Sequence, residues 1–369
     1  MRKLARPFLY FFAALWLTGS AAPALAEPLN SEGAFSGASA LNASYFPVFP
    51  LGAGDLAAPQ LLPVVSNHTL DGDHHGLTHA VIIVHDLSRD ANGIAGTIAS
   101  LAGPEGNAAF ILAPQFLIDS DVARLAGIMA EQSKMLVRWP LDGWVMGGDS
   151  IAIPPQKAIS SFTAFDLLLL YLGEKKFFPD LQSVTVAGLG AGGDFVQRYA
   201  AVGQAPDILD LQHLQVRFLV ADASSYLYFT APRFLVAKPG AKPSLGTPGA
   251  AICSTYNNYP YGLENPNAYV KRVGSAAIKL RYVTRPVTYV TGEKIQEDVP
   301  PDASCAAQLQ GSDRLTRQSG YNMYLKVTFG DAAEKLHKFM TIPKAGYEPA
   351  ALFGSPCGMA VLLGDGMCW

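Results

Sequence analysis

The sequence has little charge, and the charge it has is balanced. Only 15% of its 369 residues are Asp, Glu, Lys or Arg, and 27 basic against 30 acidic side chains give a formal net charge of −3. These charges are scattered along the chain, as expected of a solvated surface. A near-neutral protein lacks the basic patch that attracts nucleic acid or an anionic membrane. We therefore expect neither as a partner.

Long apolar runs are missing after the first 26 residues. The best later candidate, 165–172, is short, contains Asp166 and is followed by Glu174. A membrane span needs ~20 apolar residues, so we expect no membrane insertion of the mature chain. Residues 1–26 combine a basic start, an apolar stretch and a small-residue cleavage site, which is typical of a signal peptide. The mature protein is therefore expected to be exported to the periplasm or the extracellular space.

Cysteine is scarce, with four residues in the whole chain: Cys253, Cys305, Cys357 and Cys368. Four cysteines permit three pairings and fit an oxidising compartment. We expect Cys357–Cys368 to close a short C-terminal loop and Cys253–Cys305 to tie an insertion to the domain. Free buried thiols are the alternative. No cysteine lies on a strand-to-helix corner, which disfavours a cysteine nucleophile.

Metal ligands in a recognisable pattern are also absent. Several histidines gather between residues 68 and 79, but their spacing matches neither a helix face nor a zinc loop. We expect no metal site and no cofactor.

Strands and helices alternate along most of the chain. Apolar runs predict buried strands at about 79–85, 108–113, 184–189, 216–221, 285–291 and 338–342. Helices are predicted between them, including 161–172, capped by Ser160 or Ser161, and 305–315. This alternation predicts an α/β fold with a mostly parallel central sheet and helices on both faces. We expect an extended arm at 27–77 with one edge strand near 60–65, the α/β domain at 78–369, and a Tyr- and Pro-rich insertion at about 223–284 over the carboxyl edge of the sheet.

The stretch Gly188-Leu-Gly-Ala-Gly192 joins one predicted strand to a predicted helix. Strand, sharp turn and helix are the setting of the nucleophile elbow G-x-S-x-G, in which a serine attacks the substrate. Gly190 stands at the serine position, and glycine has no side chain with which to attack a carbonyl. Glycine does relieve the backbone strain of such a turn. An ordinary glycine-rich turn is the alternative interpretation.

The whole pattern resembles a secreted α/β-hydrolase family with a His-Gly-x-x-Arg-Asn-Ala loop, an Ala-Pro-Gln-Phe segment and a Gly-His-Ser-Ala-Gly-Gly elbow. The similarity spans roughly residues 78–353. The matching pieces are His85-Asp-Leu-Ser-Arg-Asp-Ala91, Ala113-Pro-Gln-Phe116, Trp139 to Ser150, Gly188–Gly193, Asp222-Ala-Ser-Ser-Tyr226, Tyr256 to Leu263, and Ser304-Cys-Ala-Ala307 with Gln310-Gly311. The resemblance implies an α/β-hydrolase fold.

This chain departs from the family where the family has its catalytic residues. The serine position is Gly190, the aspartate position is Ile295 and the histidine position is Tyr347. The oxyanion loop keeps His85 and the backbone of Ala191 but has Asp86 in place of glycine, and an inward carboxylate would oppose a developing negative charge. Because triad members act as a unit, loss of the nucleophile makes the others nearly useless.

The resemblance therefore implies an exported α/β-hydrolase-like protein without serine-hydrolase activity. Its remaining pocket, more apolar and roomier above Gly190, is expected to bind a small apolar or ester-like ligand, or else the protein binds a protein partner. The main alternative is an active esterase with a displaced nucleophile, for which Ser150, Ser224 and Ser225 are the candidates, helped by a shifted acid such as Glu297 or Asp298. A different activity on the same scaffold, such as a lyase, is a third possibility.

Overall fold

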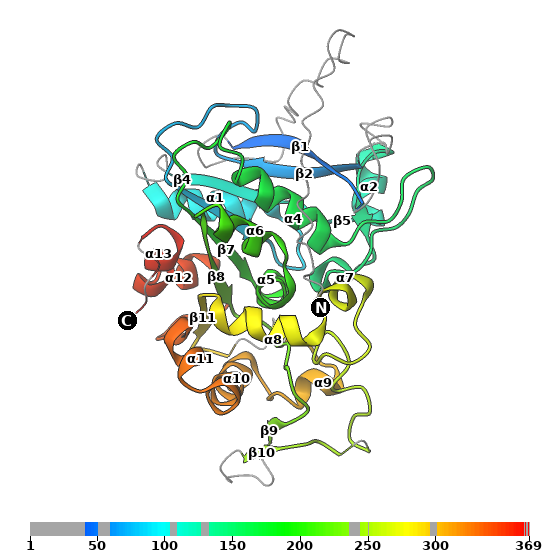
Figure 1. Cartoon of the computed structure of the whole chain (residues 1–369), viewed down its shortest axis with the longest axis vertical. Helices are drawn as coiled ribbons and strands as arrows, with labels where there is room; N and C mark the ends of the chain where they lie inside the picture. The colour runs from blue at the N-terminus through cyan, green and yellow to red at the C-terminus, as the bar shows by residue number, and fades with distance from the viewer. Residues whose placement is uncertain are drawn as a thin grey trace, which may run out of the picture.

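A single eight-stranded sheet forms the centre of the structure, a computed structural model that describes residues 41–50, 60–103, 109–126, 133–235, 244–249, 251–295, 301–364, 366 and 368. Its order is β1-β2-β4-β3-β7-β8-β11-β12 (Figure 1). The β1–β2 and β2–β4 pairs are antiparallel, and the other five pairs are parallel. The strands are β1 (Asn42–Val48), β2 (Gln60–Ser66), β3 (His79–Val84), β4 (Ala109–Pro114), β7 (Ser183–Leu189), β8 (Gln215–Ala221), β11 (Val287–Gly292) and β12 (His337–Ile342). The mostly parallel α/β architecture that the alternation predicts is confirmed.

Side chains alternate across this sheet and supply two separate cores. On β3, Ile82 and Val84 point into one core, whereas Val81 and Ile83 point into the other. The larger core packs against α4 (Ser161–Leu172), α5 (Ala191–Val202), α6 (Ala205–Leu211), α7 (Ala268–Val273), α8 (Ser275–Thr284), α10 (Arg314–Phe329) and α11 (Asp331–Leu336). The smaller core packs against α1 (Ala91–Ala102), α12 (Pro349–Phe353) and α13 (Pro356–Leu362). Burial on both faces explains why the central strands read as continuous apolar runs.

The segment expected to form an extended N-terminal arm contributes two strands to the sheet. Residues 42–48 pair with 60–66, and β2 continues the ladder onto β4. Figure 1 shows both strands at one end of the sheet. Alternate residues of β2, including Leu62 and Val64, are fully or almost fully buried. The expected signal peptide at residues 1–26 lies outside the described residues.

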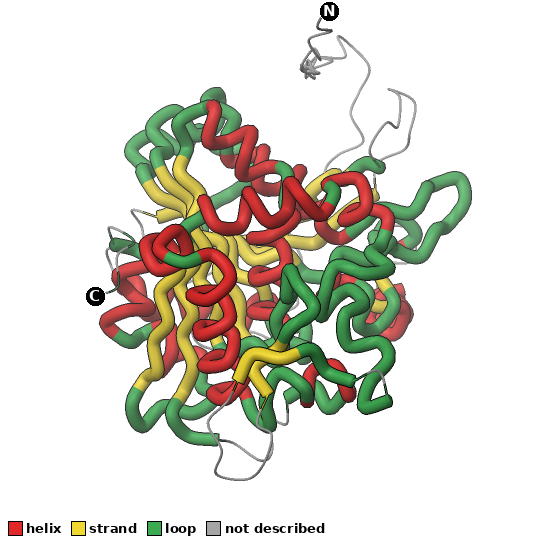
Figure 2. Tube along the Cα trace, turned by 60° about the horizontal axis from the view of Figure 1, so that its bottom comes forward, coloured by secondary structure: helices red, strands yellow, loops and turns green. Residues whose placement is uncertain are grey.

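The insertion has more regular structure than its composition suggests. It contains a hairpin of β9 (Arg233–Leu235) and β10 (Ser244–Gly246), followed by α7 and α8. Figure 2 shows this hairpin among the loops beside the sheet. The helix expected at 305–315 is wrong in extent, because α9 (Cys305–Gln308) is a single turn and α10 begins only at Arg314. Short elements complete the chain: β5 (Leu117–Ile118), α2 (Asp119–Ala126), β6 (Arg138–Trp139) and the 3-10 turn η2 (Trp144–Met146).

Both expected disulfides are confirmed, Cys253–Cys305 and Cys357–Cys368. They close segments with sequence separations of 52 and 11 residues. Within the described ranges, no helix combines the length and hydropathy needed to cross a membrane.

Candidate functional site

The turn between β7 and α5 has the backbone of a nucleophile elbow. Gly190 lies between them with φ +58° and ψ −116°, a conformation that is strained for any residue with a Cβ. Immediately before and after it, Leu189 ends the strand and Ala191 begins the helix. The parallel sheet thus presents this turn at the carboxyl edge of its strands, where open α/β sheets bind ligands.

The space above Gly190 is filled, in contrast to the roomier pocket expected from the sequence. A Cβ built on Gly190 would overlap the hydroxyl oxygen of Tyr347 and would lie 2.6 Å from Oδ1 of Asp86. Tyr347 comes from the loop between β12 and α12, whereas Asp86 lies two residues after the end of β3. The tyrosine hydroxyl thus takes the place that a serine side chain would need.

Asp86 points inward and occupies the anion site of the elbow. Its Oδ1 accepts a hydrogen bond from the backbone N–H of Ala191 at 2.8 Å, and its Oδ2 accepts one from the hydroxyl of Tyr347 at 2.7 Å. In a serine hydrolase the N–H after the nucleophile stabilises the oxyanion of the substrate. Here the chain's own carboxylate uses that donor. A developing oxyanion would therefore meet a fixed negative charge.

Tyr347 is a partly buried phenol that stays protonated. Burial, and after it the neighbouring Asp86 carboxylate, raises the pKa of Tyr347 well above its ordinary value. The phenol is therefore a neutral donor at physiological pH. The guanidinium carbon of Arg314 lies 4.5 Å from the centre of the Tyr347 ring and adds a cation–π contact that holds the ring in place.

His85 is a buried imidazole whose two nitrogens both contact backbone groups. Its Nδ1 donates to the backbone carbonyl of Asp86 at 2.8 Å, which leaves Nε2 to accept from the N–H of Phe116 at 3.0 Å. Burial lowers the pKa of His85 to about 4, so the ring is neutral. Both ring nitrogens therefore form hydrogen bonds with backbone groups, and these bonds fix the loop that carries Asp86.

Ile295 lies away from the hydrogen-bonded group around Gly190. Its side chain is 66% exposed after the end of β11, and it lines a small cavity of about 30 Å³ together with Tyr347 and Asp222. It supplies no carboxylate where the resemblance places the orienting acid. The alternative acids Glu297 and Asp298 lie outside the described residues.

Asp222 is a site residue that the sequence reasoning missed as an acid. It follows β8 with φ +43°, and its Oδ1 accepts from the N–H of Gly292 at 3.2 Å. Burial raises the pKa of Asp222 to about 7, against the lowering effect of the Gly292 hydrogen bond. Its position at the end of a parallel strand is the same signal that marks Asp86, and it could have been noticed. Arg314, which donates from Nε to the carbonyl of Asp222 at 3.1 Å, had no such signal.

Two of the three alternative serines lie beside the elbow. Ser224 donates from its hydroxyl to Oδ2 of Asp194 at 2.5 Å, and Ser225 accepts from Arg198 at 2.9 Å. Both line a cavity of about 390 Å³ next to Asp86 and Tyr347. Ser150 does not line that cavity; it is buried, and its hydroxyl oxygen accepts from the N–H of Ile159 at 2.9 Å, which makes it a turn residue.

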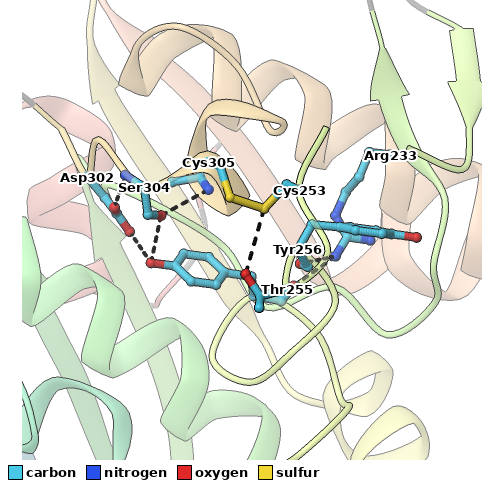
Figure 3. Close-up of a disulfide and its surroundings, with 9 residues drawn as sticks. Arg233, Cys253, Thr255, Tyr256, Asp302, Ser304 and Cys305 are labelled. Carbon is cyan, nitrogen blue, oxygen red and sulfur yellow. Dashed lines mark hydrogen bonds between the residues drawn. A yellow bond between two sulfur atoms is a disulfide. The ribbon is translucent and has the colours of Figure 1, made fainter. Parts of the chain in front are cut away.

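The insertion forms the far wall of this cavity, and a disulfide anchors it. Figure 3 shows Asp302 and Ser304 next to the Cys253–Cys305 bond, with Tyr256 and Arg233 on the other side. Asp302 accepts from the hydroxyl of Tyr261 at 2.5 Å, and both residues line the cavity. Arg233 is completely buried and donates to the carbonyls of Tyr256 and Tyr261 at 3.3 and 3.1 Å. The wall is thus held by covalent and buried polar contacts.

The histidines near residue 70 belong to packing. His74 stacks on Phe178 with ring centres 4.7 Å apart, and His79 contacts the hydroxyl of Ser183 at 2.8 Å. Among the residues that the structure describes, His, Cys, Asp and Glu form no group of three or more that could hold a metal ion.

Known proteins resemble this chain in structure only. No family model matches the chain, and no curated protein is significantly similar to it in sequence. The LpqC poly(3-hydroxybutyrate) depolymerase from Bordetella parapertussis superposes with a TM-score of 0.55 and 15% identity, over 90% of this chain and 91% of its own. Poly(aspartic acid) hydrolase-1 from Sphingomonas sp. KT-1 gives 0.50 and 20%, over 87% and 98%. The sheet, the elbow and these two superpositions together establish an α/β-hydrolase fold.

Proposed function

We propose that this protein is an α/β-hydrolase-like protein that does not hydrolyse esters and acts by binding a ligand or a partner protein. The observation that carries the proposal is the pair Tyr347 and Asp86. One takes the volume of a serine side chain above Gly190, and the other takes the N–H donor of Ala191. Nucleophile, base and anion site must act together, so the absence of all three removes the reaction.

The experiment is a hydrolysis assay in two forms. We expect p-nitrophenyl acetate and butyrate to be consumed no faster than in buffer, and we expect a fluorophosphonate probe to leave the protein unlabelled. A serine esterase of known activity provides the positive control. Catalytic turnover, or labelling that approaches one probe per chain, would contradict the proposal.

One observation supports the alternative of a displaced nucleophile, namely the short contact between Ser224 and Asp194 at the cavity wall. The same carboxylate also accepts the N–H groups of Ser224 and Ser225 at 2.8 and 3.1 Å. That arrangement is typical of a side chain that ties a loop to a helix. The variant Ser224→Ala decides the matter, because any fluorophosphonate labelling of the wild type by this route disappears in it, whereas labelling elsewhere persists.

We also propose that the protein works after export, in the periplasm or outside the cell. Support comes from the signal-like residues 1–26 and from two disulfides, which persist in oxidising compartments. N-terminal sequencing of the protein produced with its own leader should give a chain that begins at Glu27. A chain that begins at Met1 in the cytosolic fraction would contradict export.

A further inference from the structure

The cavity beside the elbow is large enough for a whole small molecule. Its volume is about 390 Å³, within the range of ligand pockets. It lies between the filled elbow, represented by Asp86 and Tyr347, and the insertion, represented by Tyr261 and Asp302. The Ala191 N–H and the Ser224 hydroxyl on its wall already donate to Asp86 and Asp194, so its use has to be deduced from the other groups that line it.

Four hydrogen-bond donors on the cavity wall are already used by the protein. The N–H of Ala191 and the hydroxyl of Tyr347 both donate to Asp86. The hydroxyl of Tyr261 donates to Asp302, and that of Ser224 donates to Asp194. Each carboxylate oxygen keeps further lone pairs, because an ionised carboxylate has about four acceptor sites. The wall therefore offers acceptors to a ligand and few donors.

The charges on the wall point in the same direction. Four carboxylates and two guanidinium groups line the cavity, which gives a formal charge of −2. Arg198 is 2% exposed; it donates to the carbonyls of Pro260 and Asp194 at 3.3 and 3.0 Å and pairs with the Asp194 carboxylate at 3.7 Å. With that pair neutralised, Asp86, Asp142 and Asp302 remain against Arg314.

We propose that this cavity binds a small organic cation, with an ammonium or amidinium group on an apolar body. The proposal rests on the proposed function, since it takes the cavity to be a binding site and not the substrate cleft of an esterase. The cationic group would donate to the Asp86, Asp142 and Asp302 carboxylates, and the ring of Tyr261 offers a cation–π face. Leu87, Val145 and Met146 supply the apolar part of the wall.

Three probes with the same fluorophore and different charge test this proposal: dansylcadaverine as the cation, dansylamide as the neutral form and dansylglycine as the anion. We expect saturable fluorescence enhancement with dansylcadaverine, a dissociation constant at least tenfold lower than for dansylglycine, and an intermediate value for dansylamide. Added salt should weaken the binding of dansylcadaverine, because salt screens the charge of partly exposed carboxylates.

Matched variants separate the wall from the overall charge of the protein. Asp142 is exposed on the cavity wall, so Asp142→Asn should raise the dissociation constant of dansylcadaverine roughly two- to fivefold and leave dansylamide unchanged. Asp210→Asn makes the same change in charge on α6, where the residue does not line the cavity, and should have no effect. Binding of dansylglycine as tight as that of dansylcadaverine, no saturable binding of any probe, or equal effects of the two variants would each overturn the proposal.

The outcome is distinguishable from a failure of the proposed function. If the protein reacts with fluorophosphonate but still binds the cationic probe most tightly and the anionic probe least, the non-hydrolytic role is wrong and the cation site stands. If the protein is inert to fluorophosphonate and binds the anionic probe best, the proposed non-hydrolytic function stands and the proposed cation site is wrong.

Discussion

The space beside the Gly190 backbone is filled by side chains on one side of the elbow and is an open cavity on the other. On one side, Tyr347 and Asp86 fill the reaction centre and bind its N–H donor. On the other side, Ser224, Tyr261 and Asp302 border an open cavity of about 390 Å³. The turn thus has a filled space on one side and an open cavity on the other.

The largest effect is expected when a side chain is forced into the filled side. Gly190→Ser should lower the free energy of unfolding by roughly 2–6 kcal/mol, from backbone strain of ~1–3 kcal/mol and overpacking of ~1–3 kcal/mol against Tyr347. It should also create no esterase activity, because Asp86 still occupies the anion site. Denaturant unfolding and the p-nitrophenyl assay measure the two results.

A second glycine separates the two causes. Gly76 also has a positive φ, +80°, but a Cβ there would meet no atom within 4 Å. Gly76→Ser should therefore show backbone strain alone, about 1–2 kcal/mol. Tyr347→Phe combined with Gly190→Ser should recover part of the larger loss by removing the overlapping hydroxyl. Equal destabilisation by the two serine substitutions would show that the elbow is not sterically closed.

The Cys253–Cys305 disulfide, which anchors the insertion on the open side, should stabilise the fold more than the Cys357–Cys368 disulfide does. Cys253–Cys305 closes 52 residues and Cys357–Cys368 closes 11. Loop-closure entropy then gives about 4 kcal/mol of stabilisation for the first and about 3 kcal/mol for the second. Replacing both cysteines of each pair by serine should reproduce this order in denaturant unfolding. A larger loss from the short C-terminal loop would mean that the insertion wall is held by its buried polar contacts, above all Arg233.

The carboxylate of Asp222 should make the filled side sensitive to pH. Its folded pKa, about 7 because of burial, lies above the ordinary value of 3.8. The stability it contributes is thus complete below pH 4 and is lost as the pH rises to about 7. At ~1.4 kcal/mol per pKa unit the loss is at most about 4 kcal/mol. Asp222→Asn stays neutral, so the stability of the wild type relative to this variant should fall across that interval and then level off.

The histidines provide an internal check on that measurement. Burial lowers the pKa of His79, His85 and His337 to about 4. The stability that these histidines contribute to the fold is lost as the pH falls from 6.5 towards 4, whereas the contribution of Asp222 is lost as the pH rises. Because both proteins carry them, they cancel in the difference. A difference that does not change between pH 4 and 7.5 would show that Asp222 is not buried as the structure has it.

The strands of the sheet could be predicted from local hydrophobic patterns, whereas the site depends on contacts between residues that are far apart in the sequence. The strands around Gly190 could be predicted because burial on both faces leaves continuous apolar runs. The helix α10 could not, since its buried residues include Arg317 and Gln318 and so blur the apolar period. The meeting of Asp86 with Tyr347 spans 261 residues, and no local pattern encodes it. The sequence therefore predicted an elbow without a serine at Gly190 but not what fills the space above it.

The smallest expected effect compares one hydrogen bond from each side. Tyr347 donates to Asp86 and Tyr261 donates to Asp302, each from a phenol to a carboxylate. Tyr347→Phe should cost about 1.5–3 kcal/mol, because it removes a charge-assisted bond to Asp86 and also the hydroxyl that packs over Gly190. Tyr261→Phe should cost about 1 kcal/mol or less, because water entering the cavity can solvate Asp302 and replace the lost donor. Denaturant unfolding of both variants gives the two values. Equal losses would mean that the packing of the Tyr347 hydroxyl over Gly190 adds nothing to the hydrogen bond, and the distinction between a filled and an open side would then disappear.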